Sequence, residues 1–174
     1  MALLKNMFEG DDHMNNLHGL FVKDLEDLYD AENQITKALP KMIKEAKNDK
    51  LRKGFEQHLI QTKEHIKRLK KIGDDLGIKY NGMKCKGMEG LLKEGEEVLK
   101  EKADANVKDA AIIGAAQKVE HYEIAGYGTA IAYAELMKHK NAVKLLKQTL
   151  KEEEATDKKL SQLAQSAINK RALN

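Results

Sequence analysis

The sequence predicts an all-α protein organised as a bundle of long helices. Apolar residues recur at every third or fourth position over long stretches, which is the pattern of amphipathic helices that bury one face. The chain has one proline, no tryptophan and 5% aromatic residues, whereas β-strands favour aromatic and β-branched residues. Its 174 residues suit one domain with a sizeable core.

The first long helix is predicted over residues 16–46. Asn16 is a suitable N-cap, and the apolar positions that follow are spaced alternately by three and four residues. Glu32 occupies a position on this stripe where a leucine is expected. Pro40 predicts a kink, or a break at which a new segment begins, because proline removes a helical hydrogen bond. Residues 1–15 are polar and contain glycine and asparagine, so we expect a flexible N-terminal arm.

A second long helix is predicted over residues 50–76, after a turn so short that the two helices should be antiparallel neighbours. A shorter helix is predicted over residues 86–101. Three glycines weaken its pattern, so we expect this helix to lie on the outside of the bundle.

The third and fourth long helices are predicted over residues 107–138 and 141–169, again joined by a short turn. Two antiparallel pairs connected by one long crossover form the topology of a ferritin-like bundle. The sequence therefore predicts a ferritin-like four-helix bundle over residues 16–170, with the extra short helix in the crossover between helices two and three.

Polar side chains interrupt the apolar stripe near the middle of every long helix. In antiparallel pairs, residues equally distant from the turn lie at one level, so these side chains should form one layer across the bundle. Counting from the first turn places Glu32 opposite His65, which makes His65 a better ligand candidate than His58. The interrupting residues are Glu32, His58, Thr62, His65, Glu120, Glu123, Glu153 and Asp157.

Five acids in one dry layer need neutralisation. Two carboxylates about 4 Å apart repel by about 4 kcal/mol at an effective dielectric constant near 20, and each buried charge costs several kcal/mol in desolvation. Either several of these acids are protonated or cations lie among them, since no lysine or arginine interrupts the stripes. Oxygen ligands with one or two imidazoles suit iron or manganese, although zinc also accepts such a set. A dinuclear iron or manganese centre is the interpretation we favour.

Each residue of the layer also has a simpler interpretation. A single acid on a stripe can reach water at the edge of a core, and His58 alone can be a hydrogen-bonded core residue. Tyr127 either hydrogen-bonds the site from one turn beyond Glu123 or is an ordinary buried tyrosine. His121 points about 100° away from Glu120, so it either orients a ligand from outside or belongs to an interface.

Composition and charge indicate where the protein is located and which kinds of partner it can bind. Cys85 is the one cysteine, so no intrachain disulfide can form, and a reducing cytoplasm is expected. It precedes a helix, where a thiolate would be stabilised, but an inert thiol is the simpler interpretation. The N-terminus lacks the apolar core of a signal peptide, and no segment approaches the roughly 20 apolar residues of a membrane span. The 31 basic and 28 acidic residues are interleaved, so no nucleic-acid surface is predicted.

Several stretches of the chain carry a resemblance to a known family. They are Asp27-Leu-Tyr-Asp-Ala-Glu32 with Ala38–Met42, Phe55–Leu59 with Thr62, Cys85 with Met88–Gly90, Ala115-Ala-Gln-Lys-Val-Glu-His-Tyr-Glu-Ile124, and Glu152-Glu153 with Ala155-Thr-Asp157. Over residues 16–169 the chain resembles the YciF-like bacterial stress proteins, a branch of the ferritin-like superfamily. The resemblance implies a helical bundle, a role in stress responses, a homodimer and a candidate iron or manganese site.

The ligand spacing departs from that of ferritin-like di-iron proteins, which carry Glu-x-x-His on two helices. The second helix offers Thr62-x-x-His65 and the third Glu120-x-x-Glu123. The fourth offers Glu153-x-x-Thr156 or Glu154-x-x-Asp157, and none of these spacings matches. One hypothesis is a redox enzyme that oxidises ferrous iron or consumes oxygen or peroxide, by analogy of fold. The alternative is a non-catalytic stress protein with a structural or degenerate metal site. Mineral storage would need a hollow shell, and the sequence shows no shell-forming surface.

Overall fold

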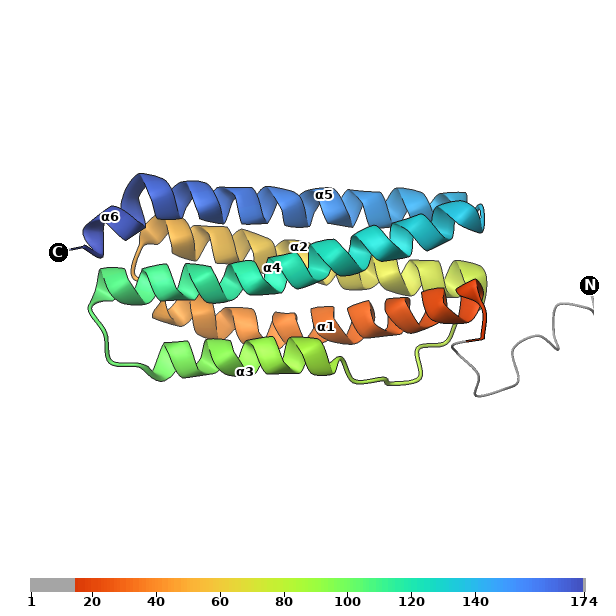
Figure 1. The fold of residues 1–174 in the computed structure, drawn as a ribbon, viewed down its shortest axis with the longest axis horizontal. Coiled ribbons are helices and arrows are strands. Elements are labelled where there is room, and N and C mark those ends of the chain that lie inside the picture. Colours follow the sequence, from red (N-terminus) through yellow and green to blue (C-terminus); the bar gives the residue numbers. More distant parts are fainter. Residues whose placement is uncertain (1–14, 174) are drawn as a thin grey trace, which may run out of the picture.

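Four long helices run along a common axis in the computed structural model, which describes residues 15–173. They are α1 (Leu17–Glu45), α2 (Asp49–Leu76), α4 (Ala105–Leu136) and α5 (Lys140–Leu163). Figure 1 shows them as one bundle, and the described residues contain no β-strand. The all-α bundle is therefore confirmed. The predicted N-terminal arm lies outside the described residues, apart from Asn15.

The extra helix, α3 (Lys86–Lys100), lies outside the bundle alongside α1 and α4 (Figure 1). It belongs to the long connection between α2 and α4, as predicted. Only Met88 of α3 is buried, because the helix has one apolar face and presents the other to solvent.

Side chains fix the ends of the helices. Asn16 accepts a hydrogen bond from the backbone N–H of Gly19 at 2.8 Å, which confirms it as the N-cap of α1. The turn between α1 and α2 is fixed from a distant part of the chain. The buried carboxylate of Asp109 on α4 accepts hydrogen bonds from the backbone N–H groups of Lys47 and Asn48 at 2.9 and 2.7 Å.

Two details of the long helices differ from the prediction. Of the two alternatives predicted at Pro40, a kink or a break, the break is wrong, because α1 continues through Pro40. Pro40 is exposed and lies near the end of the helix, so one lost backbone hydrogen bond is tolerated there. The last helix is not one element either: α5 ends at Leu163 and is followed by a π-helical segment, η1 (Ala164–Ile168), and by α6 (Asn169–Arg171).

The apolar core is divided into two clusters along the bundle. One cluster includes Phe55, Ile113 and Leu160, and the other includes Phe21 and Leu146. The polar interruptions of the four helices lie between these clusters in the sequence of each helix. The polar layer of the bundle therefore lies between two apolar clusters, which exclude water from both ends of the layer.

Candidate metal centre

Six polar side chains of the predicted layer meet inside the bundle, and we call them the carboxylate–histidine cluster. All are at most 2% exposed. They come from all four long helices: Glu32 from α1, His58 and His65 from α2, Glu120 and Glu123 from α4, and Glu153 from α5.

The cluster contains two sets of potential ligands that share one carboxylate. The first set is His58, Glu120, Glu123 and Glu153, and the second is Glu32, His65 and Glu153. Within each set, one donor atom of every residue lies within 4.8 Å of the others. Glu153 is the residue common to both sets and would be shared if each set held a cation. Both histidines come from α2, seven residues and about two turns apart, so each set has one imidazole without a Glu-x-x-His motif.

The distances place histidine nitrogens against carboxylate oxygens. In the first set, Nε2 of His58 lies 3.3 Å from Oε1 of Glu120 and 3.9 Å from Oε2 of Glu153. In the second set, Nδ1 of His65 lies 2.8 Å from Oε1 of Glu153 and 3.2 Å from Oε1 of Glu32. His58 and His65 thus both belong to the cluster, one in each set. The sequence analysis preferred His65 as a ligand, but the structure places both imidazoles against carboxylates.

Several of these atoms are buried without a well-formed hydrogen bond among the described residues. They are Oε2 of Glu32, Nε2 of His58, Oε2 of Glu120, Oε1 of Glu123 and Oε2 of Glu153. Nδ1 of His65 and Oε1 of Glu153 also lack a hydrogen bond, although they lie 2.8 Å apart as an ion pair. Native interiors rarely leave such groups unsatisfied, because each costs about 1–3 kcal/mol. Divalent cations would satisfy these lone pairs, and two of them would neutralise the four carboxylates. The donor set fits iron or manganese.

Protons are the other means of neutralising the cluster. Burial, together with the neighbouring carboxylates, raises the pKa of Glu120 and that of Glu123 well above the usual range. Burial also raises the pKa of Glu32, against the opposing influence of His65. Without metal, burial therefore favours the protonated forms of these acids, and metal binding would have to displace those protons.

His65 and Glu153 form the charged pair of the cluster. Burial alone would lower the pKa of His65, but its contacts with Glu153 and Glu32 outweigh burial and raise it to about 10. Burial would raise the pKa of Glu153, but the contact with His65 and the nearby His58 lower it. The pKa of His58 is lowered, chiefly by burial. One imidazole is thus cationic in the metal-free cluster and the other is neutral.

The far side of the His65 ring is held by two residues that the sequence analysis did not identify as part of the site. Nε2 of His65 lies 2.9 Å from Oε2 of Glu152. Arg68 donates two hydrogen bonds to the same carboxylate, at 2.7 and 3.0 Å. When Nε2 donates its proton to Glu152, Nδ1 is left as the ligand atom that faces the cluster. The only signals in the sequence were that Glu152 precedes Glu153 and that Arg68 follows His65 by one turn.

The other residues predicted around the site have different roles. Tyr127 is fully buried and donates a hydrogen bond to Oε1 of Glu32. Thr62 is also buried, but its hydroxyl donates to the backbone carbonyl of His58 at 2.9 Å and not to a carboxylate. The residue that contacts the free side of His58 is Thr156, whose hydroxyl oxygen lies 3.4 Å from Nδ1.

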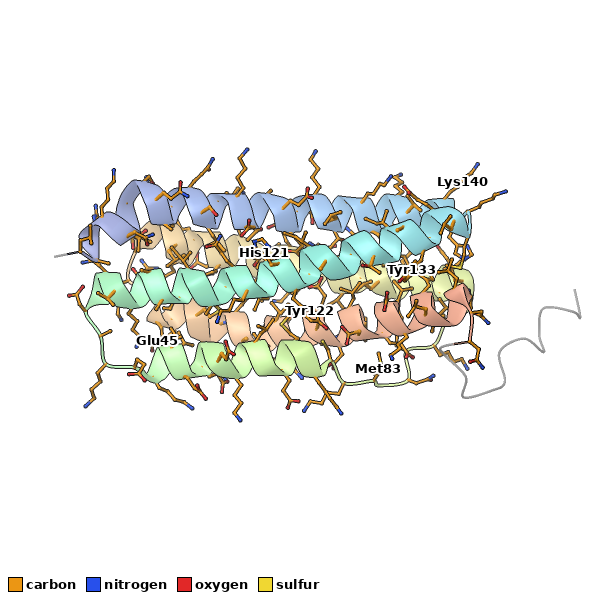
Figure 2. The ribbon with its side chains drawn as sticks, in the orientation of Figure 1. Glu45, Met83, His121, Tyr122, Tyr133 and Lys140 are labelled. Carbon is orange, nitrogen blue, oxygen red and sulfur yellow. The ribbon has the colours of Figure 1, made fainter. Side chains whose placement is uncertain are left out.

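Asp157 and His121 lie outside the cluster. Asp157 accepts a hydrogen bond from Gln117 at 2.8 Å, and His121 lies 3.5 Å from the same carboxylate. The His121 side chain is 68% exposed and is labelled on α4 in Figure 2. The buried positions of α5 continue from Glu153 to Thr156 and Leu160, so Asp157, about 100° around the helix from Thr156, lies outside this seam.

Cys85 is a structural residue of the α3 N-terminus. Its sulfur accepts a hydrogen bond from the backbone N–H of Met88 at 3.3 Å and lies 3.1 Å from the hydroxyl of Tyr122, which is labelled in Figure 2. Tyr122 donates to Asp27 on α1 at 2.6 Å. The thiol is buried, and burial raises its pKa, which favours the inert-thiol interpretation.

The sequence and the fold of this chain are similar to those of known proteins. Residues 16–173 match a family described as a domain of unknown function, DUF892. Protein YciF of Escherichia coli K12 is 45% identical over 163 residues, which cover 93% of this chain and 98% of YciF. The crystal structure of the E. coli stress protein YciF matches with a TM-score of 0.87, covering 90% of this chain and 99% of that one.

A second solved structure is YcfI from Rhodopseudomonas palustris, named as a candidate structural protein. It is 46% identical, has a TM-score of 0.83, and the match covers 88% of this chain and 97% of that chain. None of the helices in residues 15–173 combines the length and the apolar character that crossing a bilayer requires. The predicted resemblance to YciF-like stress proteins is confirmed, and the chain belongs to the DUF892 family.

Proposed function

We propose that this YciF-like protein acts in the bacterial stress response by binding a dinuclear iron or manganese centre in the carboxylate–histidine cluster. The observation that supports the proposal most directly is the group of buried, unsatisfied ligand atoms, arranged in two sets that share Glu153. Each set contains one imidazole and at least two carboxylates, a donor set that suits these metals.

The two ions would be held by different parts of the bundle. His58, Glu120 and Glu123 would bind one, Glu32 and His65 the other, and Glu153 would bind both. Such a pair of ions, when bound, supplies the redox chemistry that oxidises ferrous iron or consumes peroxide or oxygen. Tyr127 would orient Glu32 by its hydrogen bond, and the apolar clusters on either side would exclude bulk water.

A non-catalytic role is the second candidate. The raised pKa values of Glu120 and Glu123 provide a way for the cluster to be neutral without metal, and the relative YcfI is named as a candidate structural protein. In this case the protein would act through a surface contact. For either function we propose a cytoplasmic location, which the single buried cysteine favours. We also propose a homodimer, which the family resemblance favours.

Metal content tests the proposal. We expect the purified protein to carry about two equivalents of iron or manganese by elemental analysis. Glu123→Gln, which keeps the size of the side chain but removes its charge, should lower this content, whereas Glu154→Gln at an exposed position of α5 should not. Peroxide consumption by the same three proteins then separates an enzyme from a scaffold. Metal-free protein whose stability is unchanged by chelators would favour the non-catalytic role.

A further inference from the structure

A groove of about 380 Å³ lies between α2 and the last part of the chain, and we call it the α2–α5 groove. Its base is formed by apolar residues that include Phe55 and Leu160. Ser166 of the π-helical segment η1 also lines it. Single π-helical turns occur disproportionately at functional sites, which directs attention to this part of the surface.

The groove reaches the neighbourhood of the carboxylate–histidine cluster. One of its lining residues, Thr156, lies 3.4 Å from Nδ1 of His58. The opposite ring nitrogen of His58 faces Glu120 at 3.3 Å. A chain of contacts therefore runs from the lining of the groove through Thr156 and the imidazole ring to Glu120.

The charge of the groove determines whether it favours the entry of anions or of cations. Lys50 and Lys159 line it together with glutamine side chains, and no carboxylate is found among its described lining residues. The two ammonium groups raise the local concentration of small anions and lower that of cations. Another groove, between α1 and α4, has the opposite character, because Asp24 and Asp27 line it.

We infer that the α2–α5 groove is the route by which small inorganic anions, the class that includes the oxygen-derived oxidant superoxide, reach the buried cluster past Thr156 and His58. This inference rests on the proposed function, since it assumes a metal centre that such an anion can bind. It adds the class of ligand and the side from which the ligand enters.

Two variants and their matched controls test the route. Lys159→Glu reverses one charge of the groove, and Lys158→Glu makes the same change at the adjacent exposed residue, which does not line the groove. Gly54→Phe places a ring in the groove, where a Cβ at Gly54 would have no neighbour within 4 Å. Gly90→Phe is its control at an equally open glycine of α3.

The measurement is the rate at which azide binds the iron-loaded protein, followed by stopped-flow absorption of the iron–azide band. We expect Lys159→Glu to slow binding by at least about threefold at low ionic strength, with the difference shrinking at high salt. We expect Gly54→Phe to slow it by about tenfold, equivalent to about 1.4 kcal/mol in the barrier. Gly90→Phe should bind azide at the rate of the unchanged protein, and Lys158→Glu, which does not line the groove, should slow binding clearly less than Lys159→Glu does.

Elemental analysis of each protein is done first, so that two failures can be told apart. A chain that binds neither iron nor manganese, when supplied with each, overturns the proposed function and the route with it. A chain that holds its iron, but in which either groove variant binds azide as fast as its control, overturns the route alone.

Discussion

Glu153 is the residue on which the two halves of the cluster depend. Its two oxygens face His65 on one side and His58 on the other, at 2.8 and 3.9 Å. A carboxylate shared in this way would let two imidazoles from one helix serve the two proposed ions, which the usual Glu-x-x-His spacing achieves from two helices. His65 is held in this arrangement by Glu152, which is in turn fixed by Arg68.

Replacing Glu152 should weaken metal binding without touching a proposed ligand. Glu152→Ala removes the acceptor of Nε2 of His65, so the ring is no longer held with Nδ1 facing the cluster. We expect the affinity for one of the two ions to fall by about 10- to 100-fold, the effect typical of partners of ligating histidines. Titration with manganese, followed by calorimetry, measures this change.

The same titration on Glu154→Ala provides the control, because Glu154 is exposed on the same helix. An affinity of Glu152→Ala equal to that of the unchanged protein would show that Glu152 does not position His65.

At the scale of elements, the bundle depends on contacts between helices that are distant in sequence. Asp109 on α4 accepts two backbone hydrogen bonds from the turn between α1 and α2. This contact fixes the level of one hairpin against the other, and hence the level at which Glu32 and His65 meet Glu120 and Glu123.

Removing the Asp109 carboxylate should therefore destabilise the whole bundle. Asp109→Ala leaves the N–H groups of Lys47 and Asn48 without their acceptor. We expect the free energy of unfolding to fall by about 1–3 kcal/mol, measured by urea denaturation. Asp74→Ala, at an exposed position of α2, should change it by less than about 0.5 kcal/mol. Equal stability of the two variants would contradict this role for Asp109.

The helices could be predicted because local sequence patterns determine where they begin and end and which face is buried. One example is Asn16, which directly precedes the apolar stripe of α1. The polar layer could be predicted for the same reason, since the spacing of residues in the sequence is enough to recognise Glu32 or Glu153 at a position of an apolar stripe. Contacts across the bundle could not. Neither the support of His65 by Glu152 nor the rotation of Asp157 out of the seam follows from spacing alone, because both depend on how α2, α4 and α5 are turned about their axes.

For the whole molecule, the cluster links folding to pH and to metal. The apolar clusters at either end of the polar layer hold it in a dry interior, so its charges must be neutralised by protons or by cations. The protons are those implied by the raised pKa values of Glu120 and Glu123, and of His65 at about 10. Metal and protons therefore compete for the same atoms, and their effects on stability have opposite dependences on pH.

The metal-free protein should lose stability as the pH rises from about 7 to about 8.5. Folded His65 keeps its proton in this range, because its pKa is about 10, whereas the unfolded side chain, with an ordinary pKa near 6.5, releases it. The raised pKa values of Glu120 and Glu123 act in the same direction. Because the folded state binds more protons, the free energy of unfolding falls by up to about 1.4 kcal/mol per pH unit for each such proton. His58 does not oppose this trend, since its lowered pKa matters only below about 6.5.

The stabilisation added by metal should change in the opposite direction over the same range, because binding displaces protons that are scarcer at higher pH. Thermal unfolding with and without manganese, under anaerobic conditions at the two pH values, measures both trends. In the metal-free state, Glu123→Gln should flatten the pH dependence by removing one titrating group, and Glu154→Gln should leave it unchanged. A metal-free protein equally stable at both pH values, with the same increment from manganese at each, would mean that neither protons nor cations neutralise the buried carboxylates as proposed.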